Sequence, residues 1–114
     1  MGDALSLLTS PSQEPLPKLF QPIRVGEMQL THRVVHPPMT RFRSGHDGVP
    51  TDLVATYYAQ RASVPGTLLI AEATSIAPKA GQGPWVPGVY TDAQIAGWKK
   101  VRVRPYAEPC SFAC

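Results

Sequence analysis

The feature that most restricts how this chain can fold is the run RVVHPPMTRFR, residues 33–43, where an apolar stretch stops at two consecutive prolines. Proline has no backbone N–H to donate to a sheet, so a central strand does not continue through Pro37 and Pro38. We therefore expect a buried strand to end at this corner and its backbone to turn outward towards a ligand.

The segments around this corner predict a hairpin, a strand and a loop. PIRV and MQL flank Gly26 and Glu27, a pattern typical of two short strands joined by a turn. The compact apolar run HRVVHPPM is typical of a strand covered on both faces. The following segment, RFRSGHDGVPTD, contains two glycines and a proline and predicts a long loop.

A helix is predicted next, over DLVATYYAQRAS, residues 52–63. Thr51 or Asp52 can cap it, because a short side-chain oxygen accepts hydrogen bonds from the first free backbone N–H groups. Its apolar residues form one helical stripe, which comprises Leu53, Val54, Tyr57, Tyr58 and Ala62.

A second strand and a second helix complete the pattern. The first half of TLLIAEATSIA, residues 67–77, predicts a buried strand. TDAQIAGWKKV, residues 91–101, predicts a helix that is capped by Thr91 and has Ile95 and Trp98 as an apolar pair.

Strands that alternate with helices indicate an α/β fold with parallel strand pairing through right-handed crossovers. Ligands of such folds bind at the carboxyl ends of the strands. Two corners have that position in this chain, PPMT at residues 37–40 and EATS at residues 72–75.

Length and composition fit a single small domain, since the chain has 114 residues, of which 43% are hydrophobic. No apolar run reaches the roughly 18 residues of a membrane span. The amino-terminal residues lack the basic start of a secretory signal. We therefore expect a soluble cytoplasmic protein that does not act at a membrane.

The net charge of +3 comes largely from a basic cluster, which comprises Lys99, Lys100, Arg102 and Arg104. Such a cluster can bind nucleic acid, but no aromatic stacking residues accompany it, so a solvated helix end is favoured. Cys110 and Cys114 are too few for a metal site. His32 and His36 would lie roughly 13 Å apart on a strand, too far to chelate one ion. No nucleic acid and no metal are expected.

Three segments resemble the old yellow enzyme family of flavin-dependent reductases, and in particular its fungal members. They are LFQPIRVGEMQLTHRVVHPPMTRFRS, YYAQRASVPGTLLIAEATSIAPKAG and VPGVYTDAQIAGWKKV, in the family's order and spacing. The resemblance implies an incomplete (β/α)8 TIM barrel with the N-terminal hairpin and the first two βα units only. Residues 1–18 would be a flexible lead-in, 19–101 the first part of an FMN-binding barrel and 102–114 a non-homologous tail without an apolar strand.

The resemblance also implies a chemistry and a cofactor site. Family members take hydride from NADPH or NADH onto FMN and pass it to the activated C=C bond of an α,β-unsaturated carbonyl, a small enone or enal. By position, Pro38, Met39 and Thr40 would line the flavin ring, with the Thr40 hydroxyl on flavin O4, and Ala73 would pack against the isoalloxazine. Without the resemblance, Thr40 would be a loop cap and Ala73 a core residue. Gly83 stands where many relatives have an aromatic residue near the substrate.

The family's catalytic residues belong to later strands and have no counterpart here. The tyrosines do not match the context of the family's proton donor; they are Tyr57, Tyr58, Tyr90 and Tyr106. We therefore assign no catalytic residue and expect a truncated chain that is inactive by itself, so enzyme status stays open. The alternatives are a non-enzymatic remnant, a partner-dependent fragment, or a full-length reductase or isomerase of secondary metabolism misrepresented by a gene-model error.

Overall fold

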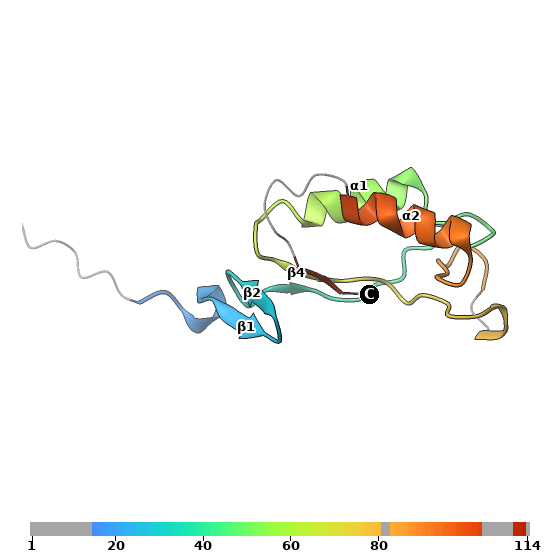
Figure 1. The fold of residues 1–114 in the computed structure, drawn as a ribbon. Helices are drawn as coiled ribbons and strands as arrows, with labels where there is room; N and C mark the ends of the chain where they lie inside the picture. Colours follow the sequence, from blue (N-terminus) through green and yellow to red (C-terminus); the bar gives the residue numbers. More distant parts are fainter. Residues whose placement is uncertain (1–14, 81–82, 104–110, 114) are drawn as a thin grey trace, which may run out of the picture.

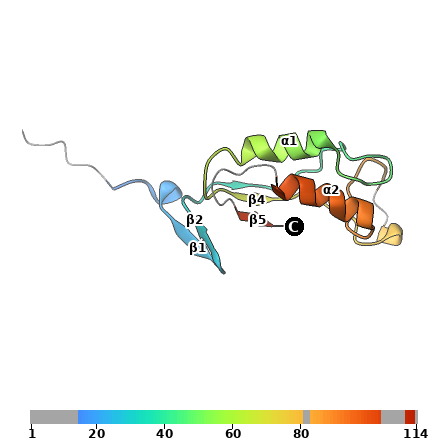
Figure 2. The ribbon, with the colours of Figure 1, turned by 45° about the horizontal axis from the view of Figure 1, so that its top comes forward.

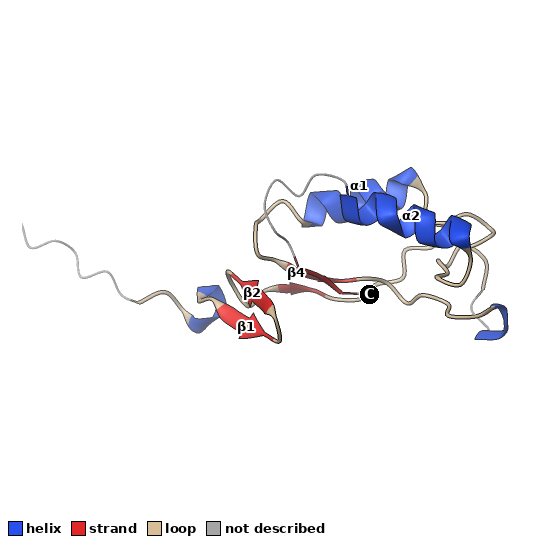
Figure 3. Ribbon diagram, in the orientation of Figure 1, coloured by secondary structure: helices blue, strands red, loops and turns tan. Residues whose placement is uncertain are grey.

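The computed structural model describes residues 15–80, 83–103 and 111–113, which form a hairpin and a parallel sheet with two helices on one face (Figures 1 and 2). The hairpin pairs β1 with β2, and the sheet has the strand order β3-β4-β5. Long loops connect the strands to the helices that follow them (Figure 3). The elements are η1 (Lys18–Phe20), β1 (Ile23–Val25), β2 (Met28–Leu30), β3 (Val35–His36), α1 (Asp52–Arg61), β4 (Leu68–Ile70), η2 (Pro78–Ala80), α2 (Asp92–Val103) and β5 (Ser111–Ala113).

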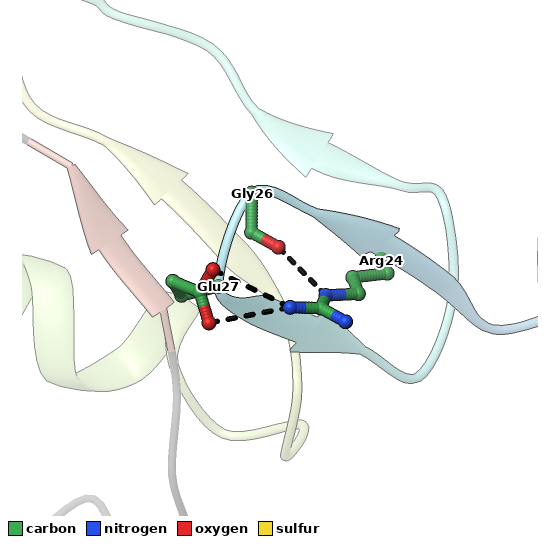
Figure 4. A network of polar contacts seen from close by, with 3 residues as sticks. All are labelled: Arg24, Gly26 and Glu27. Carbon is green, nitrogen blue, oxygen red and sulfur yellow. Dashed lines mark hydrogen bonds and ion pairs between the residues drawn. The ribbon is translucent and has the colours of Figure 1, made fainter.

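The hairpin forms where the sequence predicts it. Val25 pairs with Met28, so Gly26 and Glu27 are the two turn residues, and Gly26 has the positive φ of 58° that such a turn requires. The Arg24 side chain closes over this turn, with Nε donating to the Gly26 carbonyl at 2.8 Å and Nη2 lying 3.2 Å from Glu27 Oε2 (Figure 4). Because both charged side chains are largely exposed, this ion pair contributes little to stability.

The hairpin is joined to the amino end of β4. Thr31 donates from its backbone N–H to the Gly66 carbonyl and from its hydroxyl to the Pro65 carbonyl, at 3.3 and 2.7 Å. His32 Nε2 lies 2.9 Å from the Thr67 hydroxyl oxygen. Gly66 has a φ of 73°, and a Cβ at this position would lie 2.5 Å from Thr31 Cγ2. A glycine is therefore required at this junction.

The predicted parallel pairing is confirmed, because β3 and β4 pair in parallel through Val35 with Leu68 and His36 with Leu69. The expectation of a tail without a strand is wrong, since β5 pairs in parallel with the other edge of β4. A three-residue strand needs only backbone partners at an open sheet edge, so no apolar run announces it. Cys110 and Cys114 lie outside the described residues, which leave out 104–110 and 114.

The core lies between the sheet and the helices and consists of Val54, Ala55, Tyr58, Ala71, Trp98 and Val101. The prediction that Leu53 and Ile95 belong to the apolar faces of their helices is wrong, because their side chains are 65% and 38% exposed. Ala55 and Gln94 take the buried positions instead. The other predicted positions hold, since Val54, Tyr58 and Trp98 are buried, so only the margin of each apolar face differs from the expected one.

The expectation that the first strand is covered on both faces is also wrong. Val35 is exposed whereas the next residue, His36, contacts Tyr57 of α1, because both helices cover the same face of the sheet (Figure 2). The strands that the structure describes do not close into a barrel. No helix within the described ranges is long and apolar enough to cross a membrane.

Candidate functional site

The two predicted corners lie at the same end of the sheet. Pro38, Met39 and Thr40 follow β3, and Ala73 follows β4, whose parallel pairing puts both carboxyl ends at one edge. The side chains of Pro38, Met39 and Ala73 are exposed, and that of Thr40 is half-buried. The corner residues therefore form an accessible rim rather than part of the core.

The two alternative roles for these residues do not agree with the structure. Ala73 is exposed, so it is not a core residue. The Thr40 hydroxyl makes no hydrogen bond within the described residues, so it does not cap a loop there. A short unpaired hydroxyl, an exposed methionine and a small alanine fit the edge and face of a flat ring that carries hydrogen-bonding groups. Whether they contact such a ring stays a prediction.

Glu72, the first residue of the EATS corner, connects the two corners, a role that its sequence position does not predict. Its Oε2 accepts a hydrogen bond of 3.0 Å from the Arg41 backbone N–H, 31 residues earlier in the chain. Its own backbone N–H donates to the Tyr58 hydroxyl at 2.8 Å. Only 3% of the Glu72 surface is exposed. Burial raises the pKa of the Glu72 carboxyl above its usual range, and the Arg41 N–H and guanidinium partly oppose that shift.

Beside Glu72, Tyr57 links β3 to α1. Its hydroxyl lies 3.1 Å from His36 Nε2, and the Arg61 guanidinium lies 3.7 Å from the centre of its ring. The Arg41 guanidinium approaches the same ring, at 5.1 Å. A cavity of about 180 Å³ lies next to this cluster and is lined by Arg41, Arg43, Leu53, Val54, Tyr57 and Glu72. Arg41, Arg61 and Tyr57 therefore form a cationic and aromatic cluster next to the first corner.

Gln94 fastens the loops at this end of the sheet. Its N–H donates to the Thr91 hydroxyl at 3.2 Å, which confirms Thr91 as the cap of α2. Its Oε1 accepts from the backbone N–H groups of Tyr90 and Thr91, and its Nε2 donates to the Asp47 carbonyl. The motif T-x-x-Q, residues 91–94, is a capping box and could have predicted the local half of this network.

The other predicted cap is wrong in its chemistry. Thr51 stands at the N-cap position of α1 but makes no capping hydrogen bond with its side chain. Its hydroxyl donates instead to the Arg43 carbonyl, at 2.7 Å. The threonine therefore closes the first loop rather than the helix end.

Two exposed aromatic residues on these loops have an unusual backbone. Phe42 and Trp85 have positive φ values, 53° and 70°, a region that L-residues rarely adopt. The Ser44 N–H donates to the Trp85 carbonyl and so joins the two segments, and the Trp85 ring stands edge-on to His46. Gly83 is exposed and has open space where a side chain would begin.

No group of three potential metal-binding side chains occurs among residues 15–80, 83–103 and 111–113. The histidines and acidic residues of the site are instead engaged with neighbouring side chains and backbone. His32 and His36 each have a hydrogen-bond partner of their own.

The chain is similar in sequence to known proteins. The chain is 56% identical over 84 residues to the chanoclavine-I aldehyde reductase fgaOx3 of Penicillium roqueforti, and the match covers 74% of this chain and 23% of the reductase. It is 54% identical over 83 residues to a protein of Epichloe festucae var. lolii named "Probable inactive reductase easA", covering 73% of this chain and 22% of that one. The chain thus spans about a quarter of the length of these relatives.

Among solved structures, the Old Yellow Enzyme of a Pichia species matches with a TM-score of 0.76 and 45% identity, over 83% of this chain and 25% of that one. Such neighbours are (β/α)8 barrels, so the sheet and helices described above are part of that fold. Residues 18–104 also match the family model for FMN-linked oxidoreductases. This span includes both corners, and it shows that the chain belongs to the NADH:flavin oxidoreductase / NADH oxidase family.

Proposed function

We propose that this chain forms the first part of the flavin site in an FMN-dependent NAD(P)H oxidoreductase that reduces activated C=C bonds of α,β-unsaturated carbonyls. The observation that carries this proposal is the pair of exposed corners at the carboxyl ends of β3 and β4, connected through Glu72 and Arg41. Family membership and the names of the similar reductases support it.

Each corner residue has a task in this proposal. The Thr40 hydroxyl, which has no hydrogen-bond partner among the described residues, would hydrogen-bond flavin O4 and so tune the electron affinity of the ring. Pro38 and Met39 pack against the ring, and the small side chain of Ala73 allows its close approach. When bound, FMN would supply hydride transfer, with NADPH or NADH as reductant and an enone or enal as acceptor. The apolar side chains of the two corners would exclude water from the bound ring.

A second candidate function is non-catalytic: the 114-residue chain does not reduce enones by itself and is a remnant or acts only with a partner. Two observations favour it. The chain covers 23% of the length of the similar reductase fgaOx3, and a relative 54% identical to it carries the name "Probable inactive reductase easA". No described residue is assigned a catalytic role.

Flavin titration separates these candidates. The purified chain is titrated with FMN, whose fluorescence is quenched on binding, and NADPH oxidation is followed with cyclohexenone as acceptor. We expect Thr40→Ala to weaken FMN binding about tenfold, the effect of one lost hydrogen bond. Thr56→Ala is the matched control, because the Thr56 hydroxyl bonds Asp52 within α1, away from the corners.

The same measurement is made on a hybrid in which residues 18–103 replace the matching segment of the Penicillium reductase. Flavin bound by the hybrid but not by the chain alone supports the non-catalytic candidate for this chain. Failure of both to bind FMN contradicts the flavin site.

A further inference from the structure

We propose that Glu72 is a positioning residue for the flavin site, whose carboxyl group fixes the first corner against the second. This inference rests on the proposed function. It assigns to a buried carboxylate, which would touch neither cofactor nor substrate, the task of aligning the Thr40 hydroxyl with Ala73.

The contacts of Glu72 place it at the centre of three elements. Its Oε2 accepts from the Arg41 N–H at 3.0 Å, immediately after Thr40, and its own N–H donates to the Tyr58 hydroxyl of α1 at 2.8 Å. Ala73 is its direct neighbour in the chain. The Glu72 side chain therefore links the first corner to the second, and its backbone links the second corner to α1.

Burying the Glu72 carboxyl group costs free energy of desolvation, so its presence at this position calls for a specific reason. Glu72 is 3% exposed, and its Oε1 has no hydrogen-bond partner among the described residues. An apolar side chain would avoid the desolvation of a carboxylate, and such replacements are often stabilising. It would also leave the Arg41 N–H without its acceptor. The carboxyl thus provides a specific acceptor at this point rather than general stability.

The position of that acceptor explains why the first corner can lie open. After Pro37 and Pro38, which donate no backbone hydrogen bonds, the chain leaves the sheet, and β3 contains only Val35–His36. The Arg41 bond to Glu72 is the contact that ties this departing segment to the neighbouring strand. Without it, the Thr40 hydroxyl would sample many positions, and its orientation would have to be restored on binding.

Two substitutions test this role. Glu72→Gln keeps a side-chain acceptor, whereas Glu72→Ala removes it, and Glu27→Ala is the control at an exposed carboxylate of the hairpin. Amide hydrogen exchange of Arg41 is measured without flavin, in the chain and in the hybrid barrel described above. In Glu72→Ala, exchange should become about tenfold faster or more, as expected for a lost charge-assisted hydrogen bond. Glu72→Gln should restore protection, and Glu27→Ala should leave it unchanged.

A double-mutant cycle in the hybrid separates positioning from simple destabilisation. Thr40→Ala is made with and without Glu72→Ala, and FMN dissociation constants and the visible flavin absorption band are recorded. If Glu72 acts through Thr40, the effect of Thr40→Ala should largely disappear when Glu72 is already absent.

Unchanged Arg41 exchange in Glu72→Ala would overturn the proposed contact. Additive effects of the two substitutions on FMN binding would overturn the positioning role. If Arg41 protection depends on Glu72 but wild-type chain and hybrid both fail to bind FMN, the proposed function fails and the positioning role with it, while the hydrogen bond stands as a structural one.

Discussion

The side-chain amide of Gln94 donates a 2.9 Å hydrogen bond to the backbone carbonyl of Asp47, 47 residues earlier in the chain. The same side chain accepts from the N–H groups of Tyr90 and Thr91 at the start of α2. The loop after β3 and the loop before α2 are therefore held together by one buried amide. Nearby, the Gly88 N–H donates to the Gly48 carbonyl and reinforces the same junction.

Replacing Gln94 should destabilise the chain substantially. Gln94→Ala removes one donor and one acceptor from a buried site and leaves the N–H groups of Tyr90 and Thr91 without their partner. We expect the free energy of unfolding to fall by about 2–4 kcal/mol, measured by urea denaturation. Gln60→Ala, on the exposed side of α1, should change it by less than about 0.5 kcal/mol. Similar losses in both variants would contradict the role of Gln94.

Gly88 should tolerate no side chain. A Cβ at this position would lie 2.5 Å from Gln94 Oε1, whereas a Cβ at Gly83 would meet nothing within 4 Å. Gly88→Ala should therefore cost about 1–3 kcal/mol of stability through overpacking, and Gly83→Ala should be neutral. Thermal unfolding of the two variants beside wild type tests this difference. A neutral Gly88→Ala would show that the Gln94 amide can move aside.

Removing the Tyr58 hydroxyl should lower the free energy of unfolding. Tyr58→Phe keeps the buried ring but leaves the Glu72 N–H without an acceptor, at a cost of about 1–3 kcal/mol. Tyr90→Phe is the matched control, because Tyr90 is exposed. Denaturant unfolding gives both values, and equal stability of the two variants would argue against the Tyr58 contact.

Glu72 should make stability depend on pH. Because burial raises its pKa in the folded state, the folded chain binds the proton more tightly than the unfolded chain does. The resulting contribution of Glu72 to the free energy of unfolding is fully present below the ordinary carboxyl pKa, and it is lost as the pH rises through the raised pKa. Glu72→Gln should therefore gain stability relative to wild type as the pH rises above the ordinary carboxyl pKa.

Urea denaturation at several pH values measures this trend, and Glu27→Gln at the exposed hairpin turn is the control. A constant difference between Glu72→Gln and wild type across these pH values would contradict the assigned burial effect. The sign is decisive, since a carboxylate stabilised by an ion pair would give the opposite slope.

Local patterns in the sequence predicted the elements well, and long-range partners account for the errors. Thr91 was predicted correctly as a cap because its partner, the Gln94 N–H, lies three residues away. Thr51 also precedes a helix, but it has Val54 rather than Gln or Glu three residues later, and its hydroxyl donates across the loop to the Arg43 carbonyl. A sequence pattern alone does not reveal which of two such partners prevails.

The same reasoning explains why Glu72 and Gln94 were not recognised as organising residues. A glutamate after a strand and a glutamine in the first turn of a helix are ordinary in a sequence. Their importance comes from partners at Arg41 and Asp47, which only the fold brings near. Conversely, the two corners were located by their position after the strands, and the resemblance of a continuous segment to a known family supplied their flavin contacts, which stay a prediction.

The hairpin lies at the opposite end of β4 from the corners. Gly66 and its contacts with Thr31 precede β4, and Glu72 follows it, so roughly 20 Å of extended backbone separates them. Substitutions that far apart combine additively. The hairpin junction could therefore be engineered to raise stability while the opposite rim of the same molecule is varied to change its chemistry. Neither change would cancel the effect of the other.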